Sequence, residues 1–218
     1  MLGVELGVAA GVFSKEMVHS GYFRKFFGVD AYSDHHDTIE YFKALQSIGI
    51  FSQYKLIRMR FEEAEGLFAD ESLDFVYVDG YAHTGEDQGR TIYAWLPKVK
   101  VGGVLAGHDY HPDWPAVVGA VNALCYQTGF PLYVTELSRE PSAQDFYPSW
   151  AVIKQTSVSP SPPSELAELV MRTEAPGRHD PLNDPLSIRL RAAARLALGG
   201  RSIRLIKTLI KQTKSEEK

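Results

Sequence analysis

The stretch that decides the fold is Val4-Glu5-Leu6-Gly7-Val8-Ala9-Ala10-Gly11-Val12-Phe13-Ser14, near the start of the chain. It predicts a buried strand, then a loop with two glycines, then a helix. Gly7 and Gly11 lack a Cβ, so their backbone can approach a ligand closely and can adopt positive φ angles. Glu5, near the end of the strand, can accept hydrogen bonds or balance a positive charge. This arrangement is typical of loops that bind the nucleotide part of a cofactor, although the pattern alone does not name the ligand.

Composition limits the classes of protein to which the chain can belong. It has 218 residues, 44% hydrophobic and 23% charged, as in a soluble globular domain with a short appendage. The net charge of -4 gives no indication of a nucleic-acid partner, and no apolar run reaches the roughly 18 residues of a membrane span. The single cysteine, Cys125, excludes an internal disulfide and a multi-cysteine metal site. No signal peptide precedes the first strand, so we expect a cytoplasmic protein.

Strand-like and helical segments alternate along residues 4–154. Short apolar runs predict strands at residues 4–6, 26–30, 54–59, 73–79, 104–107, 132–137 and 150–154. Helical patterns lie at residues 13–20, 38–48, 61–68, 86–96 and 115–128, and a glycine turn at residues 101–103 precedes the fifth strand. Five strand and helix repeats predict an α/β fold, a three-layer Rossmann-like sandwich with a mainly parallel seven-stranded sheet. Only a loop joins the last two strands, so we expect them to form a C-terminal antiparallel pair.

A run rich in serine and proline divides the chain. Residues 1–155 form the predicted cofactor-binding domain, and residues 156–164 are a predicted linker. Residues 165–218 predict a helical, basic appendage, because residues 189–214 carry Arg and Lys but no acid. Such a helix can pack on the domain with its basic side in water, or contact an anionic membrane surface or a partner. Because the chain opens directly on a strand, we expect a loop, this appendage or a second subunit of a homo-oligomer to cover the cofactor.

Acidic residues stand at or just beyond the ends of four predicted strands. They are Glu5, Asp30, Asp79 and Asp109. The carboxyl ends of parallel strands share one edge of the sheet, where ligands bind. Four acids beside a glycine loop therefore predict a functional site at this edge.

Two further blocks of sequence resemble a known family. They are VYVDGYAHT at residues 76–84 and AWLPKVKVGGVLAGHDY at residues 94–110. With the first loop, they resemble the class I S-adenosylmethionine-dependent methyltransferases over residues 1–155. Within that class they are similar to methyltransferase family 24, which is related to macrolide-sugar and aminocoumarin-sugar O-methyltransferases. The resemblance implies S-adenosylmethionine as the cofactor.

The resemblance also implies which residues bind this cofactor. The loop around its methionine end consists of Glu5, Gly7, Val8, Ala9 and Gly11. Asp30 accepts hydrogen bonds from both ribose hydroxyls, a task that suits an ionised carboxylate because it is acceptor-only. The adenine and the region of the transferred methyl group are contacted by Ala31, Tyr32, Phe61, Glu62 and Asp79.

A reaction centre is implied around Asp79 and Asp109, which follow neighbouring strands. Methyl transfer to a hydroxyl requires removal of its proton, by a base or by a divalent cation that lowers the hydroxyl pKa. Sugar O-methyltransferases of this group often hold Mg²⁺ with three acids, whereas here His108 stands in the place of one acid. Asp79, His108 and Asp109 therefore stay candidates either for a divalent metal, Mg²⁺ or a more histidine-tolerant ion such as Mn²⁺, or for metal-free catalysis by a histidine base. His83, four residues after Asp79, is a further candidate base or ligand.

We therefore expect a methyltransferase that acts on a hydroxyl of a small acceptor, such as a sugar, a glycoside or a similar metabolite. An apolar acceptor wall, or simply core, would be formed by Tyr81, Tyr110, Trp114 and Trp150. Two other classes stay open: a non-catalytic cofactor-binding module acting through the basic appendage, and a nicotinamide-dependent oxidoreductase. The oxidoreductase would need a G-x-G-x-x-G loop, and Gly7 and Gly11 do not have that spacing.

Overall fold

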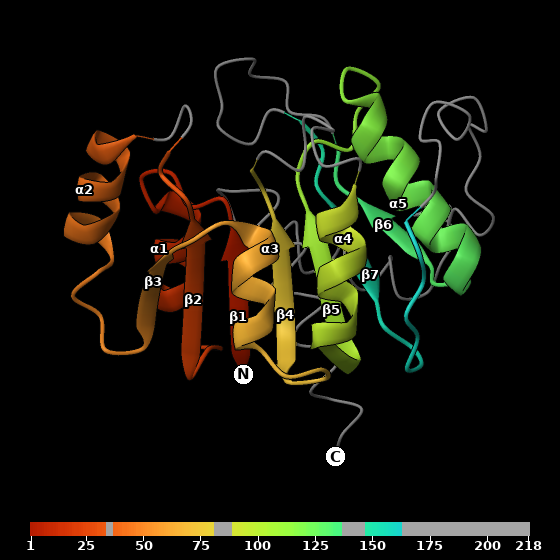
Figure 1. Ribbon diagram of the computed structural model, residues 1–218, viewed down its shortest axis with the longest axis horizontal. Helices are drawn as coiled ribbons and strands as arrows, with labels where there is room; N and C mark the ends of the chain where they lie inside the picture. Colours follow the sequence, from red (N-terminus) through yellow and green to blue (C-terminus); the bar gives the residue numbers. More distant parts are fainter. Residues whose placement is uncertain (34–36, 81–88, 137–146, 163–218) are drawn as a thin grey trace.

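The structure, a computed structural model, describes residues 1–33, 37–80, 89–136 and 147–162 (Figure 1). Its strands are β1 (Leu2–Leu6), β2 (Lys25–Asp30), β3 (Tyr54–Arg58), β4 (Leu73–Val78), β5 (Val99–Gly107), β6 (Leu132–Val134) and β7 (Trp150–Ile153). Its helices are α1 (Val12–His19), α2 (Thr38–Ser47), α3 (Phe61–Ala64), α4 (Arg90–Trp95) and α5 (Pro115–Thr128), with short 3-10 helices η1 (Glu65–Leu67) and η3 (Leu96–Lys98).

All seven strands form one sheet in the order β3-β2-β1-β4-β5-β7-β6. The pairs from β3 to β5 are parallel, and β7 is antiparallel to both β5 and β6. The predicted mainly parallel sheet with a C-terminal antiparallel pair is therefore confirmed. Because β2 and β4 lie on opposite sides of β1, the chain direction across the sheet reverses there, which makes the β1 and β4 ends the switch point where ligands bind.

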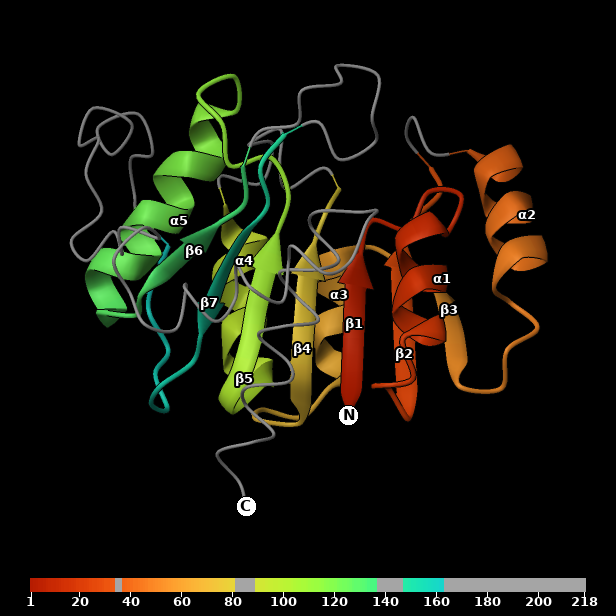
Figure 2. The ribbon, with the colours of Figure 1, turned by 180° about the vertical axis from the view of Figure 1, so that it is seen from behind.

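Helices cover both faces of the sheet, as expected for a three-layer sandwich. In Figure 1, α3, α4 and α5 lie in front of the strands, whereas the reverse view in Figure 2 shows α1 on the other face and α2 beside the β3 edge. Ile92, Trp95 and Leu124 belong to the larger buried cluster, which includes residues of α3, α4 and α5. Met17 and Val18 of α1 belong to a second cluster that packs against Phe75. These two apolar layers hold β1 and β4 rigidly between them.

One predicted boundary is wrong in an informative way. The turn at residues 101–103 was expected to precede the fifth strand, but β5 runs without interruption from Val99 to Gly107. The pairing with β4 shifts between Leu73, which pairs with Val99, and Phe75, which pairs with Val104. Gly102, at φ +82, lies inside this bulge, so the glycines mark a β-bulge and not the start of the strand.

Other predicted elements differ mainly at their ends. The helix expected at residues 61–68 divides into α3 and η1. The helix expected at residues 86–96 begins at Arg90, after Gly89, its N-cap with a φ of +74, and residues 81–88 lie outside the described residues. Residues 156–162 contain neither helix nor strand, and the predicted appendage lies outside the described residues. In the described part of the chain, no helix combines the length and apolar character needed to cross a membrane.

A buried lysine links several segments at the edge of the sheet opposite the carboxyl ends of the parallel strands. Lys154, just after β7, is only 1% exposed. Its Nζ donates to the carbonyl of Val99 at 2.8 Å and to Glu71 Oε1 at 3.3 Å, and lies 3.5 Å from the carbonyl of Pro97. A buried ammonium group is tolerated only where such acceptors surround it. Lys154 therefore links β7 to η3, to the start of β5 and to the loop before β4.

We predict that Lys154→Met destabilises the protein by about 2 kcal/mol, because it leaves these oxygens without their charged donor. The matched control is Lys25→Met, since Lys25 Nζ donates to a single surface carbonyl, that of Ser52. The control should change the free energy of unfolding by less than about 0.5 kcal/mol. Urea unfolding of both variants measures the difference, and equal stabilities would contradict a structural role for Lys154.

Candidate functional site

The backbone at the end of β1 contacts the backbone at the end of β4, at the carboxyl edge of the sheet. The amide of Asp79 donates to the carbonyl of Leu6 at 2.7 Å, and the amide of Gly7 donates to the carbonyl of Val29 at 2.9 Å. A Cβ on Gly7 would lie 1.3 Å from the Asp79 carbonyl oxygen, and Gly7 has a φ of +92. Only glycine fits this point, because any side chain would collide with backbone. The loops after β1 and β4 therefore touch directly.

The loop beyond Gly7 turns sharply into α1. The amide of Gly11 donates to the carbonyl of Val8 at 2.8 Å, and Gly11, at φ +79, is the N-cap of α1. Ala9 also has a positive φ, +45, although it carries a side chain. The predicted methionine-end residues Gly7, Val8, Ala9 and Gly11 thus form one tight loop at the switch point.

Asp30, at the end of β2, binds the backbone of this loop. Its Oδ2 accepts hydrogen bonds from the amides of Val8, at 2.8 Å, and Ala9, at 3.1 Å. Its Oδ1 accepts from the amide of Tyr32 at 2.9 Å, and Asp30 is 4% exposed. The sequence interpretation had assigned this carboxylate to the ribose hydroxyls. In this structure it organises the loop, and its contact with a ribose stays a prediction.

Glu5 lies beneath the loop and not on its surface. It is 2% exposed, and the hydroxyl of Ser14 donates to its Oε2. The Ser14 hydroxyl also lies 3.0 Å from the hydroxyl of Tyr54. Burial raises the pKa of Glu5 well above its usual value of 4.5, an effect that the Ser14 hydrogen bond opposes and the charge of Asp79 reinforces. Glu5 therefore supports the strand end from within the α1 layer.

The residues predicted near the adenine occupy the neighbouring rim. Phe61 is 3% exposed, and a Cβ on Gly80 would lie 2.7 Å from its ring. The side chain of Glu62 is 55% exposed and pairs with Arg60 Nε at 2.5 Å. Ala31, after β2, accepts a hydrogen bond from Arg58 Nε at 3.3 Å through its carbonyl. Phe61 thus packs beneath the β4 end, whereas Glu62 lies at the surface, paired with Arg60.

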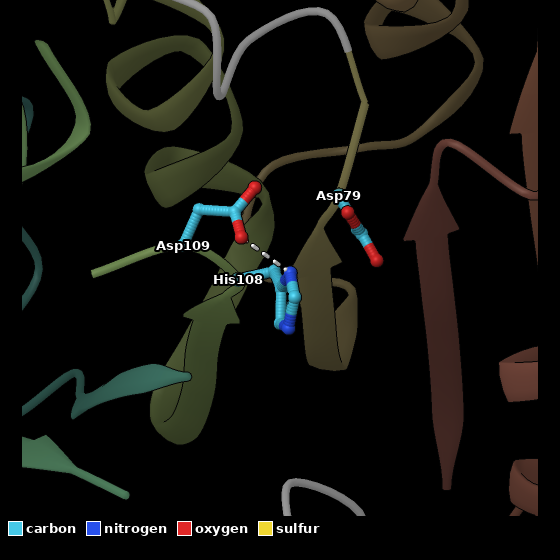
Figure 3. A group of neighbouring side chains, drawn as sticks. All are labelled: Asp79, His108 and Asp109. Atoms are coloured by element: carbon cyan, nitrogen blue, oxygen red, sulfur yellow. Dashed lines mark ion pairs between the residues drawn. The ribbon is translucent and has the colours of Figure 1, made fainter. Parts of the chain in front are cut away.

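Asp79, His108 and Asp109 come together beyond β4 and β5 (Figure 3). The two strands are parallel neighbours, with Val78 paired to Gly107, so the residues that follow them must be close. One ligand atom from each of the three residues lies within 4.8 Å of the others. His108 Nδ1 is 2.8 Å from Asp109 Oδ1, and the Asp109 side chain is only 6% exposed. Asp109 has a φ of +60, a conformation that aspartate tolerates better than most residues.

This arrangement has two chemical capacities. A carboxylate beside Nδ1 fixes the orientation of the imidazole and stabilises the imidazolium that forms when the ring accepts a proton, which suits a general base. The same mixed nitrogen and oxygen donors also suit a divalent transition metal. His83, the other predicted base, lies outside the described residues.

Aromatic side chains lie at the carboxyl edge near Asp79, His108 and Asp109, and only some of them were predicted from the sequence. Trp150 is 1% exposed and belongs to the core, not to an acceptor wall. Tyr110 and Trp114 are partly exposed, and Tyr110 donates through its hydroxyl to Asn122 Oδ1 at 2.7 Å. Tyr81 lies outside the described residues.

Tyr147 is a rim residue that the sequence analysis did not single out. Its hydroxyl donates to Asp113 Oδ2 at 3.0 Å, its ring centroid is 5.0 Å from that of His111, and Trp114 meets it edge-on. It precedes β7, whose antiparallel pairing with β5 sets Trp150 opposite Gly107. That pairing carries Tyr147 to the carboxyl edge, and the predicted antiparallel strand was the signal that could have located it.

Comparison with known proteins identifies the class. The sequence model of the Methyltransf_24 family, described as a methyltransferase domain, matches residues 1–110. No functionally curated protein matches the chain. The chain belongs to methyltransferase family 24, and it is an S-adenosylmethionine-dependent methyltransferase. This membership decides against the nicotinamide-dependent alternative.

Solved structures share the fold. The N-methyltransferase NodS from Bradyrhizobium japonicum WM9 is 18% identical, with a TM-score of 0.53 over 71% of this chain and 86% of that one. Cofactor-bound Rv0187 from MTB is 14% identical, with a TM-score of 0.52 over 71% and 72%. An S-adenosylmethionine-dependent methyltransferase from Mesorhizobium loti is 16% identical, with a TM-score of 0.50 over 69% and 89%. At these identities the likeness concerns the fold and not the acceptor.

The contact at Gly7 predicts that Gly7→Ala weakens the binding of S-adenosylhomocysteine by more than about tenfold, about 1.4 kcal/mol. The added Cβ must displace the Asp79 carbonyl, which separates the two loops. Gly21→Ala is the matched control, since Gly21 has a φ of +73 but nothing within 4 Å of an added Cβ. Calorimetric titration measures both, and equal affinities in the two variants would show that the collision is unimportant.

The buried position of Glu5 predicts a pH dependence of stability. Its folded pKa is raised, so the folded state binds more protons than the unfolded state above pH 4.5. Stability therefore falls as pH rises from this value through the folded pKa. Glu5→Gln should remove this fall, and its stability relative to wild type should increase between pH 5 and about pH 8.

Urea midpoints of the Glu5→Gln variant and wild type across this pH range provide the measurement. Glu16→Gln, an exposed change on α1, is the control and should follow wild type. A difference between Glu5→Gln and wild type that stays constant with pH would rule out this effect.

Proposed function

We propose that the protein transfers a methyl group from S-adenosylmethionine to a hydroxyl of a small acceptor, with His108 removing the hydroxyl proton. The observation that carries this proposal is the 2.8 Å contact between His108 Nδ1 and Asp109 Oδ1 beside Asp79. A hydroxyl is a weak nucleophile until its proton is removed, whereas a neutral amine needs no base. A histidine paired with a buried carboxylate at this edge therefore favours an oxygen acceptor.

Each residue of the triad has a distinct part in the proposed mechanism. Asp109 holds the ring through Nδ1, and Figure 3 shows the other ring nitrogen of His108 turned away from this carboxylate. The acceptor proton passes to that nitrogen while the acceptor oxygen bonds the methyl carbon. The bond from sulfur to the methyl carbon breaks, and its electron pair stays on sulfur, so the sulfonium becomes a neutral thioether. Asp79 and Asp109 stabilise the positive charge that develops on His108.

The aromatic rim supports an acceptor of modest size with a flat or ring-shaped apolar face. Tyr147, Trp114 and His111 form a partly exposed aromatic group that begins two residues after Asp109. Asp113, 59% exposed, adds a carboxylate that can accept hydrogen bonds from hydroxyl groups. This combination suits a sugar, a glycoside or a similar hydroxylated metabolite.

A divalent metal is a second candidate for activating the hydroxyl. The donor set of Asp79, His108 and Asp109 fits an ion that accepts both nitrogen and oxygen, such as Mn²⁺, better than it fits Mg²⁺. When bound, such an ion would lower the pKa of the acceptor hydroxyl.

The test is turnover of S-adenosylmethionine by the full chain with a panel of sugars, glycosides and phenols, followed by mass spectrometry of methylated products. His108→Asn should lower kcat by about 100-fold to 10,000-fold while the affinity for S-adenosylhomocysteine stays unchanged. His19→Asn is the matched control, since His19 is exposed at the far end of α1, and it should retain full activity.

Treatment with EDTA separates the two candidates. Activity that persists in EDTA but is lost in His108→Asn supports the histidine base. Activity that EDTA abolishes and Mn²⁺ restores supports the metal and contradicts metal-free catalysis. Full activity in His108→Asn would overturn both.

A further inference from the structure

Two residues that carry side chains adopt left-handed backbone conformations in adjacent loops. Ala9, after β1, has a φ of +45, and Tyr32, after β2, has a φ of +49. Side chains disfavour this region, and alanine and tyrosine gain no local hydrogen bond there as aspartate or asparagine would. Such conformations persist only where surrounding contacts fix them, and they concentrate at ligand clamps.

Ala9 and Tyr32 are linked through the carboxylate of Asp30, which accepts a hydrogen bond from the amide of each. The amide of Ala9 donates to Asp30 Oδ2 at 3.1 Å, and the amide of Tyr32 donates to Asp30 Oδ1 at 2.9 Å. The hydroxyl of Tyr32 donates to the carbonyl of Ala9 at 2.9 Å. Both backbone groups of Ala9 are thus bound, its amide by Asp30 and its carbonyl by Tyr32. The shape of the cofactor loop depends on these contacts.

Contacts with other residues fix the position of Tyr32. It is 2% exposed and packs with Val8 and Ala44, and its ring meets Tyr41 edge-on at 5.0 Å. Arg58 Nη2 donates to the carbonyl of Tyr32 at 3.2 Å. Burial, reinforced by the charge of Asp30, raises the pKa of Tyr32 above its usual value, so its hydroxyl stays protonated and remains a donor.

We propose that Tyr32 is a positioning residue for S-adenosylmethionine, which acts by holding the Ala9 carbonyl and so keeps the loop of residues 7–11 in the conformation that admits the cofactor. Its part in binding is indirect, through the backbone of Ala9. Because the Tyr32 hydroxyl binds the Ala9 carbonyl and the Tyr32 ring is buried, we infer that this side chain stabilises the loop of residues 7–11 and does not contact the adenine. The proposal depends on the cofactor alone and is independent of the acceptor.

Tyr32→Phe tests the hydroxyl while keeping the buried ring. We expect calorimetric titration of the full chain to give a dissociation constant for S-adenosylhomocysteine about five- to tenfold higher than that of wild type, the effect of one lost hydrogen bond. Tyr41→Phe is the matched control, since it removes a hydroxyl from the packing neighbour and should bind as wild type does. A wild-type affinity in Tyr32→Phe would overturn the proposal.

A second substitution distinguishes positioning from loss of stability. Glycine at position 9 adopts a positive φ without strain, so Ala9→Gly in the Tyr32→Phe background should recover at least half of the lost binding free energy. Thermal unfolding of the same variants should show that each is fully folded at the temperature of the titration, so that a change in global stability does not account for the change in affinity. If the double variant binds no more tightly than Tyr32→Phe, or if affinity only follows the melting temperature, the role of Tyr32 is packing and the proposal is wrong.

Discussion

The structure depends on one backbone contact, where the loop after β1 meets the loop after β4. The Asp79 carbonyl occupies the space that a side chain on Gly7 would need, and the Asp79 amide binds the Leu6 carbonyl. Two apolar layers hold the strands that lead to this point, so neither loop can withdraw without moving a strand. This constraint brings the loop of residues 7–11 and Asp79 together on one edge of the sheet.

The remainder of the site extends outward from this contact in two directions. Toward β2, Asp30 accepts hydrogen bonds from the amides of Val8, Ala9 and Tyr32, so a single buried carboxylate fixes the loops after β1 and β2. Toward β5, Asp109 orients His108 next to Asp79, which provides the proposed base. A carboxylate thus organises each side of the site: Asp30 binds backbone amides, and Asp109 binds the imidazole of His108.

Much of the fold was predictable because each strand is a short apolar run and some helices have a clear start, such as Pro115 for α5. The meeting of Asp79 with Asp109 followed from parallel neighbouring strands. The inward position of Glu5, the bulge at Gly102 and the bonds made by Asp30 were not predictable, because they depend on side-chain direction and register. Tyr147 was not singled out because α5 and β6 separate it from the other rim residues in sequence, and the antiparallel pairing of β7 brings it to the rim.

We infer that the cofactor binds across the point where β1 and β4 meet. The decisive experiment is hydrogen exchange of the full chain with and without saturating S-adenosylhomocysteine. The amides most protected by the ligand should be those of residues 7–11, 31–32 and 79–80, with little change in α5 or at the opposite edge near Lys154. Protection confined to other segments, or none at all under saturating ligand, would contradict it.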